Sequence, residues 1–320
     1  MPRPTVYVAR LLPEPVMSVI RERFLLAVEP DPQPPARPTL LHGMREASAV
    51  ICTLTERIDQ EALNAAPSLR VIANYAVGYN NIAVEAARTR SIVVTNTPDV
   101  LTETTADLTW ALLLAAARRV PEGDALVRAG AWPGWEATQL LGSDVHGKTL
   151  GLIGMGRIGK AVARRAAGFQ MSVLYWSRSP LAPSSRDPQW REASFEELLS
   201  QSDFVSVHVP LTGETEHLLG ASALRLMRRT AYLINTSRGP VVDEDALVTA
   251  IQEGRLAGAG LDVYEHEPDV TPALRALPQV VLLPHLGSAT LRTRIDMGMM
   301  CVENITAVLE GRPAPNEVRV

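Results

Sequence analysis

The sequence predicts an α/β protein of two domains, each built on a parallel sheet. Three observations support this class. Short β-branched runs alternate with helical segments, the alternation breaks near residue 99 and then starts again, and 320 residues exceed the usual size of a single core. With 46% hydrophobic residues, 21% charged residues and a net charge of −4, the composition is that of a soluble enzyme rather than of a disordered or nucleic-acid-binding chain.

The first series contains four strand candidates and two helix candidates. The strands are VYVA (6–9), AVICTL (49–54), LRVIANYAV (69–77) and IVVTNT (92–97). The helices are IDQEALNAAP (58–67) and VEAARTR (84–90). We expect EPDPQPPARP (29–38) to be a surface loop, because its prolines remove amide donors.

A long helix and an irregular arm separate the two series. LTETTADLTWALLLAAARRV (101–120) is typical of a buried helix with Thr102 as its N-cap, and we place a domain crossing there. The arm that follows, at about 120–146, carries Trp132 and Trp135.

The second series predicts a parallel sheet of six strands. They are KTLGLIG (148–154), MSVLYW (171–176), FVSVHVP (204–210), AYLINTS (231–237), GAGLDV (258–263) and VVLLPH (280–285). A last helix from Ser288 to about Leu309, stopped by Gly311 and Pro313, would return the chain to the first domain. The first domain then comprises 1–98 and 289–320, and the second comprises 99–288.

Nothing in the sequence predicts a membrane, metal or nucleic-acid partner. The apolar run Ala111 to Ala117 is too short to span a bilayer, and MPRPTVYVAR lacks a signal-peptide apolar segment. Cys52 and Cys301 have no metal-ligand spacing and indicate a reducing compartment. We therefore expect a cytoplasmic protein without a disulfide or zinc.

The segment GLIGMGRIG predicts a dinucleotide site. Gly154, Gly156 and Gly159 form GxGxxG between an apolar strand and a helix. The first glycine permits the tight turn, the second lets the backbone approach a pyrophosphate, and the third lets helix and strand pack closely. A turn without ligand, or a flavin or S-adenosylmethionine site, are the alternatives for this motif.

The strand that follows the first helix of such a unit usually ends in Asp or Glu, which binds the adenine ribose. Here Ser177, Arg178 and Ser179 stand at that point. Hydroxyls and a guanidinium can hold a 2′-phosphate that a carboxylate would repel. We therefore expect a preference for NADPH, with NADH also possible; the alternative is that Arg178 is a solvated loop residue.

Three further residues follow predicted strands: Arg238 in INTSRG, Glu267 in GLDVYEHEP and His285 in LLPHLGSAT. Taken singly, they could be a surface turn arginine, a solvated glutamate and a packed histidine. Together, at the carboxyl edge of one sheet, they fit reduction of a 2-oxo acid. Arg238 would grip the carboxylate and polarise the carbonyl, His285 would donate the proton, and Glu267 would orient His285 and favour its charged form.

At these residues the chain strongly resembles the D-isomer-specific 2-hydroxyacid dehydrogenases, and within them the glyoxylate and hydroxypyruvate reductases. The matching segments span nearly the whole chain and include NYAVGYNNI, NTPDVLTETTADL, GMGRIG, LINTSRGPVVDEDAL, GAGLDVYEHEP and PHLGSAT.

The resemblance implies two Rossmann-like, doubly wound domains, with a cofactor domain inserted into a flavodoxin-like substrate domain made of both termini. It implies Arg238, Glu267 and His285 as the catalytic set, and Val77 and Gly78 as backbone donors to the substrate carboxylate. The cofactor contacts it implies are Thr105, Gly154, Met155, Gly156, Arg157, Ile158, Gly159, Ser177, Arg178, Ser179, Pro210, Thr236, Ser237, Asp262 and Gly287. Asp262 would bond the nicotinamide carboxamide, and the arm at about 120–146 would join two chains into a homodimer.

Other functions remain open on the sequence alone. Phosphoglycerate, D-lactate, formate and phosphite dehydrogenases share much of this scaffold. A nucleotide-sensing corepressor of the same family could also retain the catalytic residues. The arm could instead be a locally packed surface loop.

Overall fold

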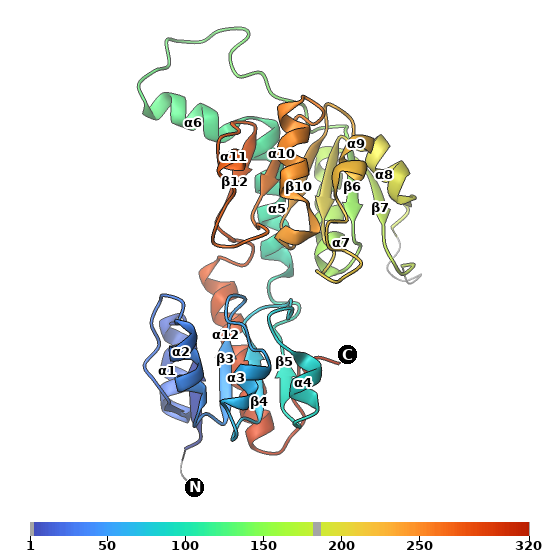
Figure 1. The fold of residues 1–320 in the computed structure, drawn as a ribbon. Helices are drawn as coiled ribbons and strands as arrows, with labels where there is room; N and C mark the ends of the chain where they lie inside the picture. The colour runs from blue at the N-terminus through green and yellow to red at the C-terminus, as the bar shows by residue number, and fades with distance from the viewer. Residues whose placement is uncertain (1–2, 182–186, 320) are drawn as a thin grey trace. The chain divides into compact units, whose positions relative to one another are not determined.

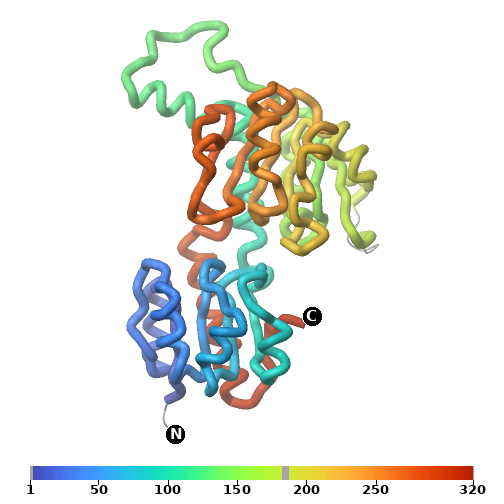
Figure 2. The backbone as a smooth tube through the Cα atoms, in the orientation of Figure 1, coloured from blue at the N-terminus to red at the C-terminus, as the bar shows by residue number. Residues whose placement is uncertain are grey.

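The computed structural model describes residues 3–181 and 187–319. The chain forms two compact units (Figures 1 and 2). The terminal unit comprises Met1–Leu101 and Ser288–Val320, and the inserted unit comprises Thr102–Gly287. Each unit contains one parallel sheet with helices packed on it, which confirms the predicted α/β class.

The terminal unit has a five-stranded sheet in the order β2-β1-β3-β4-β5, with every pair parallel. Its strands are β1 (Thr5–Val8), β2 (Leu25–Leu26), β3 (Ala49–Cys52), β4 (Val71–Asn74) and β5 (Val93–Thr95). The sequence did not predict β2, because two residues are too few to show a period of two.

Helices cover both faces of this sheet. They are α1 (Glu14–Arg23), α2 (Arg37–Met44), α3 (Gln60–Asn64), α4 (Val84–Arg88) and α12 (Leu291–Leu309). Helices α2, α3 and α4 share one core, whereas α12 packs on β4 and on α1. At that helix pair a Cβ on Gly298 would lie 2.6 Å from Val16 Cγ1, so the close approach requires glycine.

Two expected boundaries in this unit were wrong. Helix α12 starts at Leu291 and not at Ser288, because the hydroxyl of Thr290 caps it by accepting the N–H of Thr293 at 3.3 Å. Helix α2 starts inside the expected 29–38 loop, because a proline in the first turn needs no intrahelical N–H partner.

The inserted unit has a seven-stranded parallel sheet in the order β12-β11-β10-β9-β6-β7-β8. Its strands are β6 (Thr149–Ile153), β7 (Ser172–Trp176), β8 (Trp190–Glu192), β9 (Phe204–Val207), β10 (Tyr232–Asn235), β11 (Gly258–Leu261) and β12 (Val280–Leu282). All six predicted strands are present, and β8 is an additional edge strand paired with β7.

Alternate residues of these strands enter two separate cores. Leu233 of β10 faces one core, and Tyr232 and Ile234 face the other. The first core is completed by α8 (Phe195–Gln201), α9 (Ala221–Leu226), α10 (Glu244–Gln252) and α11 (Pro272–Arg275), which cover one face in Figure 1. The second core is completed by α5 (Thr102–Ala117) and α7 (Arg157–Ala166).

The single helix expected at 101–120 was wrong. Helix α5 ends at Ala117, Arg119 adopts a left-handed conformation with φ of 53°, and α6 (Val120–Arg128) begins after it. The chain beyond α6 runs out from the inserted unit as a long loop (Figure 2). We call the region 120–146 the arm. Its side chains Trp132, Trp135 and Leu141 are 52%, 83% and 66% exposed.

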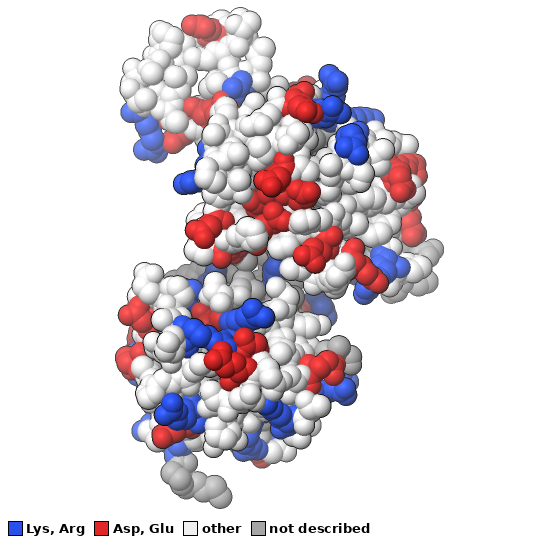
Figure 3. Space-filling view, viewed as in Figure 1, with Lys and Arg blue, Asp and Glu red and all other residues white. Residues whose placement is uncertain are grey.

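The described surface is mixed in charge. On the face in Figure 3, Lys and Arg are interspersed with Asp and Glu over the terminal unit, and acidic side chains gather near the middle of the inserted unit. Among the described residues, no helix is long and apolar enough to cross a membrane.

Candidate active site

The turn between β6 and α7 contains three glycines, and each is required for a different reason. Gly154 has φ of +99°, and a Cβ there would lie 2.7 Å from the carbonyl of His208. A Cβ on Gly159 would lie 2.2 Å from the Gly154 oxygen, so both positions are closed by protein. A Cβ on Gly156 would meet nothing within 4 Å. The middle glycine therefore faces open space, where a pyrophosphate could approach the amides at the start of α7.

The remaining residues of this turn lie as the motif requires. Met155 is buried, and Arg157 and Ile158 form the first turn of α7. The N–H of Gly154 donates to the oxygen of Trp176 at 2.8 Å, so the turn is tied to the end of β7.

Ser177, Arg178 and Ser179 directly follow β7, the strand beside β6. The Arg178 side chain is 78% exposed, and its Nη1 lies 3.6 Å from the carboxylate of Glu214, which is 80% exposed. An ion pair this exposed contributes little. The guanidinium is thus available for an anion at this edge of the sheet.

Arg238, Glu267 and His285 come from three neighbouring strands. Arg238 follows β10, Glu267 lies in the loop after β11, and His285 follows β12. The structure brings two of them into direct contact, since Nδ1 of His285 lies 2.8 Å from Oε2 of Glu267. Arg238 Nη1 donates to the carbonyl of Ser237 at 2.7 Å.

Charges around Glu267 keep it ionised. Burial alone would raise its pKa, but the hydrogen bond and charge of His285, the N–H of Tyr264 and the charge of Arg238 together lower it. Burial lowers the pKa of Arg238, and the Glu267 carboxylate opposes this. Because a carboxylate only accepts, His285 Nδ1 is the donor in the pair, which leaves Nε2 for proton exchange.

Asp262, at the end of β11, supports the turn that carries His285. Its carboxylate is fully buried and accepts the N–H groups of Leu286 at 2.6 Å and Gly287 at 2.8 Å. Burial raises the pKa of Asp262, although these two donors and the charge of His285 act against the rise. Thr105 donates its hydroxyl to the Gly287 oxygen at 3.0 Å. Gly287, two residues after His285, is therefore held by both Asp262 and Thr105.

The other expected cofactor contacts lie at the ends of β9 and β10. The hydroxyl of Thr236 forms a 2.9 Å hydrogen bond with the hydroxyl of Thr109 in α5. The hydroxyl of Ser237 donates a hydrogen bond to the carbonyl oxygen of Val209. Pro210 accepts a 2.6 Å hydrogen bond from Thr215 through its carbonyl.

Sequence reasoning missed Asn235, the last residue of β10. This side chain, only 1% exposed, accepts the N–H of Ser237 at 3.0 Å and donates to the oxygen of Arg238 at 3.0 Å. It fixes the turn that presents Arg238. An asparagine at a strand end is a known turn former, and that signal could have identified it.

Val77 and Gly78 follow β4 and belong to the terminal unit. Their carbonyls accept hydrogen bonds from the side chains of Asn96, at 2.8 Å, and Asn74, at 2.7 Å. Among the described residues, neither of their N–H groups has an acceptor. The loop is thus fixed through its carbonyls while its amides can bind a carboxylate.

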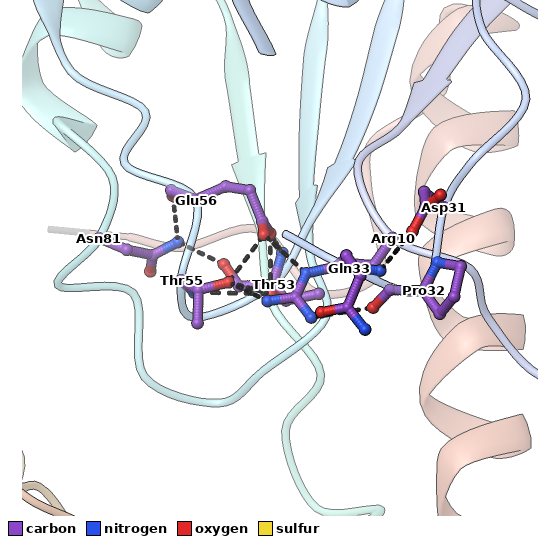
Figure 4. Close-up of polar contacts among 8 residues, drawn as sticks. All are labelled: Arg10, Asp31, Pro32, Gln33, Thr53, Thr55, Glu56 and Asn81. Carbon is purple, nitrogen blue, oxygen red and sulfur yellow. Dashed lines mark hydrogen bonds and ion pairs between the residues drawn. The ribbon is translucent and has the colours of Figure 1, made fainter. Parts of the chain in front are cut away.

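A buried carboxylate that the sequence did not reveal holds the neighbouring loop after β3 (Figure 4). Glu56, 3% exposed, accepts hydrogen bonds from the Thr53 N–H at 2.6 Å, from the Thr55 hydroxyl at 2.7 Å and from Arg10 Nε at 3.2 Å. Asn81 extends this network to the loop after β4, because its Nδ2 donates to the Thr53 oxygen at 2.8 Å.

The chain is similar to known proteins over its whole length. A family model described as "D-isomer specific 2-hydroxyacid dehydrogenase, NAD binding domain" matches residues 110–287. Glyoxylate reductase of Thermococcus litoralis is 47% identical over 99% of this chain and 97% of its own. Glyoxylate reductase of Korarchaeum cryptofilum is 50% identical over 99% of this chain and 96% of its own.

Solved structures agree with these matches. A protein of Thermus thermophilus superposes with a TM-score of 0.92 at 49% identity, covering 98% of this chain and all of the other. The NADPH-dependent glyoxylate/hydroxypyruvate reductase of Sinorhizobium meliloti, solved with NADP and malonate, has a TM-score of 0.88 at 36% identity, covering 99% and 97% of the two chains.

Proposed function

The chain belongs to the D-isomer-specific 2-hydroxyacid dehydrogenase family, and from this we propose how its residues carry out the reaction. The protein is a nicotinamide-dependent oxidoreductase that reduces a small 2-oxo acid to the 2-hydroxy acid. Glyoxylate and hydroxypyruvate are the substrates named for its relatives, and we propose them for this chain.

The contact between His285 and Glu267 carries the proposed mechanism. At 2.8 Å the carboxylate fixes the ring and its tautomer, so Nε2 can give a proton to the substrate oxygen. A bound nicotinamide supplies the hydride. Arg238, on the neighbouring β10 loop, polarises the carbonyl and binds the carboxylate beside it.

We assign the two units different tasks. The inserted unit, with its glycine turn and Asp262, would bind the cofactor. The terminal unit would bind the substrate carboxylate through the N–H groups of Val77 and Gly78. The fixed carbonyls and free amides of that loop support this role.

We further propose that the enzyme prefers NADPH, because an exposed guanidinium and two hydroxyls follow β7 where a carboxylate would select NADH. Arg178→Ala should weaken NADPH binding about tenfold or more and leave NADH nearly unchanged, since only NADPH carries the 2′-phosphate. Fluorescence titration with both cofactors measures this. The matched variant Glu214→Gln removes the neighbouring carboxylate and should not weaken NADPH. Equal losses for both cofactors in Arg178→Ala would contradict the assignment.

The activity itself is tested by mixing the protein with NADPH or NADH and a panel of glyoxylate, hydroxypyruvate, pyruvate and bulkier 2-oxo acids. Loss of reduced-cofactor absorbance identifies the substrate. Formate and phosphite with the oxidised cofactors serve as the opposing panel. Tight cofactor binding without turnover of any substrate would favour a nucleotide sensor instead.

We also propose that the arm joins two copies of the chain. It exposes three large apolar side chains, Trp132, Trp135 and Leu141, and exposed groups of this kind are common in protein interfaces.

A further inference from the structure

Glu244 is a buried carboxylate for which the proposed mechanism has no use. It is the first residue of α10 and only 4% of its surface is exposed. One of its oxygens accepts the N–H of Glu265 at 2.7 Å, and the other accepts the hydroxyl of Thr271 at 2.9 Å. Burying a carboxylate is costly in free energy. The two hydrogen-bond donors offset that cost, and so does the position at the N-terminus of a helix, where the helix dipole favours negative charge.

Both donors belong to the segment 262–271, which we call the Glu267 loop. Tyr264 and the Tyr264–Glu265 peptide, near its start, contact the segments that carry the rest of the candidate catalytic set. Tyr264 donates its N–H to Glu267 Oε1 at 3.1 Å, and its hydroxyl donates to the Leu283 oxygen at 2.8 Å, two residues before His285. On the other side, a Cβ on Gly239 would lie 1.8 Å from the Tyr264 carbonyl carbon, so the turn of Arg238 packs directly on this peptide.

A second contact holds the Glu267 loop from outside. Nε2 of His217 pairs with the side chain of Glu265, and this hydrogen bond raises the pKa of His217. The His217 side chain is 48% exposed, so solvent screens the pair. The buried bonds of Glu244 therefore contribute more to the position of the loop.

We propose that Glu244 is a positioning residue, which fixes the Tyr264–Glu265 peptide and through it aligns Glu267 with His285. This inference rests on the proposed role of Glu267. It assigns Glu244 no contact with substrate or cofactor.

Glu244→Gln tests the inference with almost no change in shape. A carboxamide keeps one acceptor oxygen for the Glu265 N–H, while its NH2 group can only donate to the Thr271 hydroxyl, so both contacts lose the charge that strengthens them. We expect kcat to fall about tenfold or more, because small displacements of catalytic groups are costly, while KM and NADPH affinity change little. The fall of the reduction rate with falling pH should also begin at higher pH, because a displaced Glu267 loses part of the hydrogen bond from His285 that lowers its pKa.

Asp245→Asn is the matched control. It removes the same charge from the same first turn of α10, but Asp245 is exposed and its side chain makes no described contact with the Glu267 loop. Its kcat and pH profile should equal those of the wild type. Thr271→Val removes one of the two donors and, should Glu244→Gln fold poorly, shows the same effects more weakly.

A double-mutant cycle with Glu267→Gln distinguishes an effect of Glu244 on the position of Glu267 from a general disturbance of the active-site structure. If Glu244 acts through Glu267, adding Glu244→Gln to Glu267→Gln changes kcat no further. Losses that multiply, or a Glu244→Gln enzyme with wild-type kcat and pH profile, would overturn the inference. A Glu267→Gln enzyme with wild-type kcat would instead overturn the proposed role of Glu267.

Discussion

The Glu267 carboxylate is the residue on which the proposed centre depends electrostatically. Three groups, His285, the Tyr264 N–H and Arg238, favour its charged form against the effect of burial. A carboxyl whose pKa is lowered by folding stabilises the protein above its unfolded pKa, and this contribution is lost as the pH falls through the lowered value.

This sign gives a prediction for stability. Near neutral pH the wild type should be more stable than Glu267→Gln by about 1–2 kcal/mol, the worth of hydrogen bonds to a charged, mostly buried group. As the pH falls below the ordinary glutamate value of 4.5, the difference should shrink towards zero. Urea unfolding of both proteins across this range measures it. A difference that grows in acid would contradict the assignment.

At the residue scale, sequence reasoning could single out polar side chains that directly follow predicted strands. Arg238, Glu267 and His285 stand out because each follows a predicted strand. Glu244 and Asn235 did not stand out, because their roles depend on partners that only the folded chain supplies. Glu244 bonds a backbone N–H of Glu265, and this contact has no signature in residue spacing.

At the scale of elements, two loops of the candidate active site meet without side chains between them. The turn after β10 packs on the loop after β11 because Gly239 has no Cβ, and the contacting atoms are backbone atoms of Tyr264 and Glu265. Backbone atoms within elements of a packed domain cannot move aside as a flexible side chain can.

Gly239→Ala should therefore destabilise the protein by about 2 kcal/mol or more and lower kcat, because Arg238 and the Glu267 loop must move apart. Thermal unfolding and steady-state kinetics check this. Gly168→Ala is the matched control, since Gly168 is exposed and a Cβ there would meet nothing within 4 Å. If Gly239→Ala retains wild-type stability, the close packing does not constrain the loops.

The strands that the sequence predicted correctly are those marked by a run of apolar residues. All ten predicted strands appear, whereas β2 and β8 are short edge strands and were missed. The break between α5 and α6 was missed because Arg119, an ordinary helix former, takes a left-handed conformation there.

At the scale of the whole molecule, the arm predicts an assembly. Trp132→Ser, Trp135→Ser and Leu141→Ser together should convert a dimer to a monomer, because these exposed apolar side chains gain most from burial against a second copy. Sedimentation velocity over a range of concentrations measures this. Leu226→Ser is the control, since Leu226 is 43% exposed and lies outside the arm. A wild type that stays monomeric at high concentration would refute the proposal.

Fold class could be predicted at this scale because strands joined by helical crossovers run parallel, and the right-handedness of these crossovers leaves few possible topologies. The order β12-β11-β10-β9-β6-β7-β8 could not be read from the strands themselves. The central strands β6, β9, β10 and β11 are buried on both faces, so their residue pattern does not indicate which strands lie beside them.

The terminal unit is made from two segments separated by the whole inserted unit. During synthesis, β1 to β5 leave the ribosome early, but α12, which packs on β4 and α1, is translated only after the inserted unit. Domains generally fold from the amino end during synthesis. Here the apolar sheet face that α12 covers stays exposed until that helix has been synthesised. That interval is when a nascent chain of this topology most needs a chaperone.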